Sequence, residues 1–258
     1  MSGVGKFLEL SVRTPDILES LSFYKNLGFR EMTTGDMYSH KYAVVSDGIL
    51  NIGLHDREFR SPSVCIVQQD LAQHARSMVD HGFNFDVMHL EEDRFNEVAV
   101  VDSDGHALTM VEARTFHADE EDDDDSLLGT HFEISLPVRD TMRAARFWGP
   151  VTQVVESIRE EPTVHMRFDA GGIPVGLSES IGLEGTSLCF KLQDPDRLAH
   201  VLEREQLNYR RYPGFEGARG VIVAPEGTHL YLFDEDFLGE TISVEESDEP
   251  FPGDDASD

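Results

Sequence analysis

Hydrophobic and polar residues alternate at the start of two stretches that resemble each other, residues 7–24 and residues 131–148. In each stretch the alternation covers about six positions, which is the pattern of a half-buried β-strand. An aspartate follows, and then an amphipathic helix that ends in two aromatic residues. Aligned without gaps, the two stretches place Glu9 on Glu133. The chain therefore contains an internal repeat that opens with a strand and a helix.

The repeat continues far beyond these opening stretches. Gly53 matches Gly176 at a separation of 123 residues, and other matched positions are 122 to 124 residues apart. Self-similarity at one period indicates copies of one structural unit. We therefore predict one domain over residues 5–115 and a second over residues 129–236.

Each predicted domain is itself doubled. Its hydrophobic pattern gives a strand, a helix and three further strands, and then the same order again. In the first domain the predicted strands are 7–12, 29–32, 42–45, 50–54, 64–68, 85–90, 97–101 and 107–112, and the predicted helices are 15–26 and 71–81. In the second, the helices 141–148 and 195–205 and the closing strand 228–233 stand out. The sequence thus predicts an α+β fold made of four strand-helix-strand-strand-strand units.

Acidic residues dominate the two remaining segments. Residues 116–128 contain seven consecutive carboxylates, Asp119–Asp125, which repel one another and predict a solvated linker. Residues 237–258 are acidic, carry proline and glycine, and are predicted to form a disordered tail.

The net charge of −29 changes the list of expected partners. Fifty acidic residues against 21 basic ones repel nucleic acids and anionic membranes, so we expect neither as a partner. The sequence contains no run of 18 apolar residues, so it predicts no membrane-spanning helix. Adaptation to high salt is the favoured interpretation of this acidity, as in halophilic proteins, and attraction of a cationic ligand is the alternative. Cys65 and Cys189 occupy matched strand positions, which predicts buried, unbonded thiols and fits a reducing cytoplasm.

The order of these motifs resembles the vicinal oxygen chelate superfamily. The likeness rests on the strand, aspartate and helix followed by Phe23-Tyr24, on the restart at Ser63, and on the closing turn Asp102–Gly105. This superfamily includes glyoxalase I, extradiol ring-cleaving dioxygenases and bleomycin-resistance proteins. The resemblance implies four βαβββ modules paired into two glyoxalase-like domains, each with a sheet that curls around a cavity.

The resemblance also implies four metal-ligand positions in each domain. In this chain they fall on Glu9, Gly53, Ser63 and Thr109 in the first domain and on Glu133, Gly176, Ser187 and Tyr231 in the second. Each domain thus keeps one plausible ligand, whereas divalent transition metals require three or more N or O donors. We therefore expect no cofactor. The alternative is one divalent metal, such as Fe, Mn, Zn or Ni, at a rearranged site made of His131, Glu133 and His229.

Strand parity nominates the residues that share a face with the two glutamates, because side chains two positions apart point the same way. Around Glu9 these are Ser11, His55, Ser63, Cys65 and Thr109; around Glu133 they are His131, Ser135, Ser178, Ser187, His229 and Tyr231. A partly buried glutamate has a raised pKa and can act as a general acid or base. Glu9, His55 and Glu133 are therefore the catalytic candidates, and the Glu9–His55 pair is placed to move a proton on a carbonyl compound.

Structural roles are the alternative for these residues. A glutamate within a strand can simply bond a serine or an arginine, and His55 can be exposed at a strand end. The cluster His40–Tyr42 is interpreted as rim or surface, and His106 as solvated.

The predicted function is binding of a small molecule in a cavity without the standard metal ligands. A lyase, isomerase or ring-cleaving dioxygenase with a rearranged metal site is the second hypothesis, and a scaffold whose acidic segments bind a basic partner is the third. A monomer and a homodimer both fit, because tandem domains can pair their modules within one chain.

Overall fold

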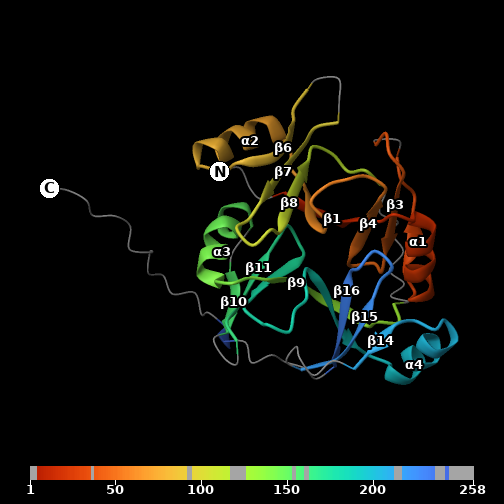
Figure 1. Ribbon diagram of the computed structural model, residues 1–258. Helices are drawn as coiled ribbons and strands as arrows, with labels where there is room; N and C mark the ends of the chain where they lie inside the picture. Colours follow the sequence, from red (N-terminus) through yellow and green to blue (C-terminus); the bar gives the residue numbers. More distant parts are fainter. Residues whose placement is uncertain are drawn as a thin grey trace.

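The computed structural model of the chain (Figure 1) describes residues 5–35, 38–91, 95–116, 126–152, 155–159, 163–211, 217–235 and 242–243. The first copy of the repeat forms an eight-stranded sheet and the second a nine-stranded sheet. The predicted α+β class is confirmed. Among the described residues, no helix has the length and apolar character needed to cross a membrane.

The first sheet joins two modules edge to edge, in the order β2-β3-β4-β1-β5-β8-β7-β6. Its elements are β1 (Lys6–Arg13), α1 (Ile17–Asn26), β2 (Arg30–Met32), β3 (Tyr42–Ser46), β4 (Asn51–His55), β5 (Ser63–Val67), α2 (Leu71–Asp80), β6 (Phe85–His89), β7 (Glu97–Val101) and β8 (Ala107–Val111). Strand β1 pairs in parallel with β4 of its own module and antiparallel with β5 of the next. The two modules therefore meet at their first strands.

The second sheet repeats this arrangement in the order β14-β15-β16-β13-β9-β12-β11-β10-β17. Its elements are β9 (Thr130–Pro137), α3 (Thr141–Trp148), η1 (Gly149–Val151), β10 (Val155–Arg159), β11 (His165–Asp169), β12 (Pro174–Ser178), β13 (Ser187–Leu192), α4 (Pro195–Arg204), β14 (Tyr209–Arg210), β15 (Ala218–Val223), β16 (His229–Asp234) and β17 (Ile242–Ser243).

Strand β17 belongs to the stretch that the sequence predicts to be a disordered tail. It pairs with β10, so that prediction does not hold for these two residues. The rest of residues 237–258 and the acidic run Asp119–Asp125 lie outside the described residues.

Aspartates begin the helices. Asp16 accepts hydrogen bonds from two backbone N–H groups in the first turn of α1, and Asp140 and Asp194 accept one each in α3 and α4. Such caps satisfy amide groups that lack a partner within the helix. Asp70, at the start of α2, makes no such bond and has a φ of 53°. Helix α1 packs against β3 and β4, and α3 against β11 and β12 (Figure 1).

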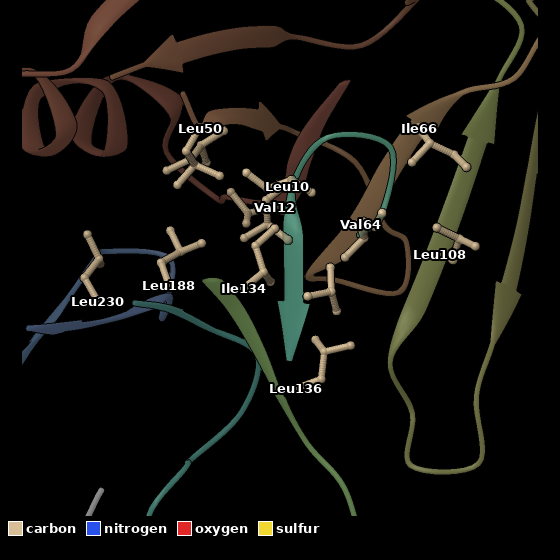
Figure 2. Close-up of a cluster of buried hydrophobic side chains, with 14 of the residues drawn as sticks. Leu10, Val12, Leu50, Val64, Ile66, Leu108, Ile134, Leu136, Leu188 and Leu230 are labelled. Carbon is tan, nitrogen blue, oxygen red and sulfur yellow. The ribbon is translucent and has the colours of Figure 1, made fainter. Parts of the chain in front are cut away.

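A large hydrophobic cluster contains residues of both sheets and joins them. Figure 2 shows side chains from both copies in one cluster: Leu10, Val12, Leu50, Val64, Ile66 and Leu108 from the first, and Ile134, Leu136, Leu188 and Leu230 from the second. A fully buried leucine contributes roughly 1.5–3 kcal/mol, so this seam stabilises the whole chain. Leu10 and Val12 alternate with Glu9 and Ser11 along β1, as Ile134 and Leu136 alternate with Glu133 and Ser135 along β9. The strand faces that carry Glu9 and Glu133 therefore point away from this hydrophobic cluster.

Two matching hydrogen bonds connect the two copies of the repeat. The hydroxyl of Tyr24, at the end of α1, donates to Glu226 over 2.6 Å. The indole N–H of Trp148, at the end of α3, donates to Asp102 over 3.0 Å. Each copy thus bonds the closing turn of the other through the last residues of its first helix.

His106 also lies at this seam. Its Nε2 donates to the backbone carbonyl of Pro137 over 2.6 Å, and the residue is only 9% exposed. The prediction that His106 is solvated is wrong, because the other half of the molecule covers the turn that carries it.

Candidate functional site

A β-bulge decides which side chains accompany each glutamate. In β1, Phe7 pairs with Ile66 and Glu9 with Cys65, so Leu8 is an extra residue. Strand β9 has the same irregularity at its matching position, between the pairs of His131 and Glu133. A glutamate and the residue two positions before it therefore lie on opposite faces.

The carboxylate of Glu9 is fully buried and fully bonded. Its Oε1 accepts from Ser11 Oγ at 2.8 Å and from His55 Nε2 at 2.9 Å, and its Oε2 accepts from Tyr42 Oη at 2.5 Å. A buried carboxylate requires such donors, since removing it from water is costly. Burial and the nearby Glu9 raise the pKa of Tyr42, so its hydroxyl stays protonated and donates.

The network continues from His55 toward the surface. His55 Nδ1 lies 2.9 Å from Nε2 of His40, a half-buried residue. Because a carboxylate only accepts, His55 donates to Glu9 through Nε2; in a neutral ring its Nδ1 then accepts from His40. Burial, together with His55 and Arg57, lowers the pKa of His40 to about 4. The result is a chain of hydrogen bonds from a half-buried imidazole to a buried carboxylate.

Aromatic rings cover this network. The Tyr38 ring centre lies 5.0 Å from that of Tyr42, 5.4 Å from that of His55 and 5.6 Å from that of Phe95. The rings exclude water from the polar groups beneath them and so strengthen their electrostatic interactions.

An ion pair borders the rings. Arg57 bonds both carboxylate oxygens of Glu97, which is 7% exposed, with Nη1 at 3.0 Å from Oε2. Burial acts to lower the pKa of Arg57, but the bonds to Glu97 outweigh it and raise this pKa. The guanidinium therefore stays charged beside the aromatic rings.

The positions that hold metal ligands in the resembling family have other roles here. A Cβ atom at Gly53 would lie 2.1 Å from Oε1 of Glu9, so the carboxylate fills the space that a larger side chain would need. Ser63 and Thr109, both buried, bond each other over 2.7 Å. This donor set does not fit a divalent transition metal. In the part of the chain that the structure describes, no group of three or more His, Cys, Asp or Glu side chains is placed to hold one.

The second sheet carries a related but smaller network. Glu133, 4% exposed, accepts from Ser135 Oγ and from His165 Nε2, the latter at 2.9 Å. Burial acts to raise the pKa of Glu133, but His165, Ser135 and Arg167 outweigh it and lower this pKa. The predicted raised pKa is therefore wrong for Glu133, because these donors stabilise its charged form.

His131 does not belong to this network. The bulge places it opposite Phe190, against whose ring it packs at 5.3 Å, whereas Glu133 lies opposite Cys189 on the other face. Neither ring nitrogen of His131 has a hydrogen-bond partner among the described residues. Burial lowers the pKa of His131 to about 3. The prediction that His131 shares the face of Glu133 is wrong, and the metal site built on that pair is not assembled.

The other residues predicted around Glu133 do share its face, by strand register. Ser135 bonds Glu133 itself, whereas two of the others bond the segment 180–185: Tyr231 Oη donates to the carbonyl of Gly182 at 3.1 Å, and Ser187 Oγ to that of Gly185 at 2.8 Å. His229 Nε2 lies 3.3 Å from Glu184. Tyr231, Ser187 and His229 therefore hold the segment 180–185 in place and do not bond Glu133.

Both cysteines are buried and free, as predicted. Cys65 and Cys189 lie opposite Glu9 and Glu133 in the strand register. Burial and the neighbouring glutamates raise the pKa of both thiols, so they remain protonated and are poor nucleophiles.

Sequence reasoning missed Tyr38 and His165, and it interpreted His40 and Tyr42 as rim or surface residues, whereas they bond buried His55 and buried Glu9. A signal existed for two of them, because Tyr42 and His165 occupy matched positions in the repeat, both at the start of a third strand. The parity argument, extended to that strand, would have placed both beside the glutamates. Tyr38 and His40 precede β3, where no period indicates a face.

Comparison of the sequence with known proteins finds no match, either to a protein-family profile or to a curated protein. Solved structures do match. The 2,3-dioxygenase LapB from Pseudomonas sp. KL28 aligns with 91% of this chain and 93% of its own, at a TM-score of 0.60 and 13% identity. The Mn(II)-bound glyoxalase from Novosphingobium aromaticivorans aligns over 91% and 83%, at 0.58 and 11%. The chain has the vicinal oxygen chelate fold.

A third structure with this fold is BphC, described as a halotolerant catechol dioxygenase. It aligns with 96% of this chain and 91% of its own, at a TM-score of 0.56 and 11% identity. At such identities the likeness establishes the vicinal oxygen chelate fold, and a function for this chain has to be argued from its own side chains.

Proposed function

We propose that this chain is a metal-independent protein that binds a small molecule on the Glu9 face of its first sheet. The observation that carries the proposal is the state of the Glu9 carboxylate. Both of its oxygens are bonded to side chains, and it fills the space beside Gly53. A glutamate in this arrangement serves as a fixed acceptor at the floor of a site and not as one ligand of a metal.

The surroundings of Glu9 suit ligand binding. Binding sites combine apolar walls with a few converging polar groups, and here aromatic rings enclose the hydroxyl of Tyr42 and the ring of His55. The half-buried His40 extends the polar network toward the surface. A ligand that contacts His40 is therefore coupled to the buried carboxylate.

The same chain of bonds supports a second candidate, an isomerase or lyase that works by proton transfer. In the tautomer described above, Nδ1 of His40 holds the lone pair and can accept a proton from a ligand. Burial, His55 and Arg57 lower the pKa of His40, so the proton is held only briefly, at the end of a chain of hydrogen bonds that leads through His55 to Glu9. Isomerisation returns the proton to another ligand atom and needs no co-reactant. A ring-cleaving dioxygenase would require a divalent metal, which this donor set does not fit.

A ligand screen by thermal shift tests the proposal. We expect compounds that raise the melting temperature of the native protein to raise that of Glu19→Gln equally, because Glu19 is exposed. The same compounds should lose most of their effect on Glu9→Gln, whose amide cannot accept from all three donors.

A second variant separates lost binding from lost folding. His40→Gln removes the half-buried end of the network and leaves the buried floor intact. Ligands that bind Glu9→Gln and His40→Gln as tightly as the native protein would overturn the proposed site.

A further inference from the structure

The space above the Glu9 network is occupied by a side chain of the protein itself. Four rings surround Tyr38: His40 at 4.8 Å, Tyr42 at 5.0 Å, His55 at 5.4 Å and Phe95 at 5.6 Å between ring centres. Three of these contacts are edge-on, one of the two arrangements that aromatic pairs prefer. Tyr38 therefore sits in a cage whose members include the bonding partners of Glu9.

A cation completes the cage. The guanidinium of Arg57 lies 5.5 Å from the centre of the Tyr38 ring, and its bonds to Glu97 hold it there. A cation at this distance is attracted by the electron-rich face of a ring. The cage thus selects an aromatic ring and not merely an apolar group.

The surroundings of Tyr38 disfavour a negative charge on its hydroxyl. Burial, with Cys65, Glu9 and Glu97 nearby, raises the pKa of Tyr38 far above its ordinary range, although Arg57 opposes this. The surroundings therefore accept a neutral phenol and resist a phenolate.

Tyr38 is not part of a strand of the first sheet. It lies between β2 and β3, outside both strands, so none of the ladder bonds of the first sheet depends on it. Its ring can be removed from the cage without unpairing a strand.

We propose that Tyr38 occupies the position of a ligand's aromatic ring and that the ligand, a neutral phenol-sized aromatic molecule, binds by replacing it. This inference rests on the proposed function, since it assumes the Glu9 site. Tyr38 then acts as a built-in competitor, and the affinity of the native protein is reduced by the fraction of molecules in which the cage is filled.

The test is a titration with p-cresol, which is the tyrosine side chain as a free molecule. Tyr38→Gly empties the cage, and isothermal titration calorimetry should show saturable binding at least about tenfold tighter than to the native protein, because competition is removed. p-Cresol should also restore part of the lost melting temperature. Toluene, which lacks the hydroxyl, and ionised 4-nitrophenol should bind more weakly than p-cresol.

Two variants serve as controls. Tyr38→Phe keeps the ring but loses the hydroxyl, so it should bind p-cresol more tightly than the native protein and less tightly than Tyr38→Gly. Tyr209→Gly removes a tyrosine whose hydroxyl bonds only a backbone carbonyl, and p-cresol should leave it unchanged. If Tyr38→Gly fails to fold, Tyr38→Ala replaces it in the same titration.

Several results would overturn the inference. Equal affinity of p-cresol for the native protein and Tyr38→Gly would show that Tyr38 blocks nothing. Absence of binding to the folded variant would show that the cage is no ligand position, and equal binding of toluene would show an unselective cavity. None of these outcomes bears on the Glu9→Gln ligand screen, so failure here is distinguishable from failure of the proposed function.

Discussion

The two buried glutamates are each bonded to a histidine, but the histidines come from different strands. His55 lies at the end of β4 and His165 at the start of β11. The repeat places Ser178 at the position of His55, and Tyr42 at that of His165. An unpaired buried charge is expensive, so each glutamate requires its own partner, wherever one can reach it. The recurring feature is therefore the compensated carboxylate and not a conserved pair of positions.

Gly53→Ala tests how tightly the Glu9 carboxylate is packed. The new methyl group would lie 2.1 Å from Oε1, so the carboxylate must move and lose bonds to Ser11 and His55. We expect the free energy of unfolding to fall by about 2 kcal/mol or more, as in other overpacked sites. Gly149→Ala is the matched control, because nothing lies within 4 Å of its Cβ position. Equal stabilities of the two variants in urea denaturation would refute this packing.

His131→Phe tests the buried imidazole without bonding partners. Phe7 occupies the matched position of the repeat, so the larger apolar ring suits this place. Removing an unsatisfied buried polar group should stabilise the protein by about 1–3 kcal/mol at pH 7.

The same variant should alter the pH dependence. The native pKa of His131 is about 3, and an unfolded histidine titrates near about 6.5. Between these values the unfolded chain binds the extra proton, so the native protein loses stability as the pH falls, and His131→Phe should lose less. Denaturation at pH 7 and pH 5 measures this, with the exposed His200→Phe as control; parallel pH profiles for all three proteins would contradict the assignment.

At the scale of elements, the helix starts give a paired prediction. Asp16→Ala removes a cap that accepts from two backbone N–H groups and should cost about 1 kcal/mol. Asp70→Gly should be neutral or stabilising, because Asp70 makes no cap bond and its φ of 53° suits glycine. Thermal melts of both variants check this, and a larger loss from Asp70→Gly than from Asp16→Ala would contradict it.

The strands and helices were predictable because their hydrophobic periods are strong, and the repeat supplied each pattern twice. The side of the sheet to which each side chain points was less predictable. A bulge adds one residue without breaking the alternation in the sequence, so parity counted along β9 puts His131 on the wrong side. Tyr38 and His40 lie in a connection, where only tertiary packing determines what a side chain meets. The candidate site was therefore predicted at its glutamates, Ser11 and His55, and missed at its covering rings.

At the scale of the whole molecule, the charge of −29 gives a further prediction. The Debye length, over which charges act on one another, falls from roughly 10 Å at 0.1 M salt to roughly 3 Å at 1 M. Added salt should therefore weaken the repulsion among carboxylates. We expect the melting temperature to rise between 0.1 M and 1 M KCl at pH 7, and to rise less near the isoelectric point of about 4.5. A melting temperature that falls with salt at pH 7 would contradict this.

The proposed function requires that neither glutamate holds a divalent metal. Elemental analysis by ICP-MS tests this directly, on untagged protein purified in molar KCl without chelator. We expect far less than one metal ion per chain, also after incubation with iron, manganese, zinc or nickel and desalting. Close to one ion per chain, lost in Glu9→Gln or Glu133→Gln, would contradict it and make a metal enzyme with a rearranged site the better description.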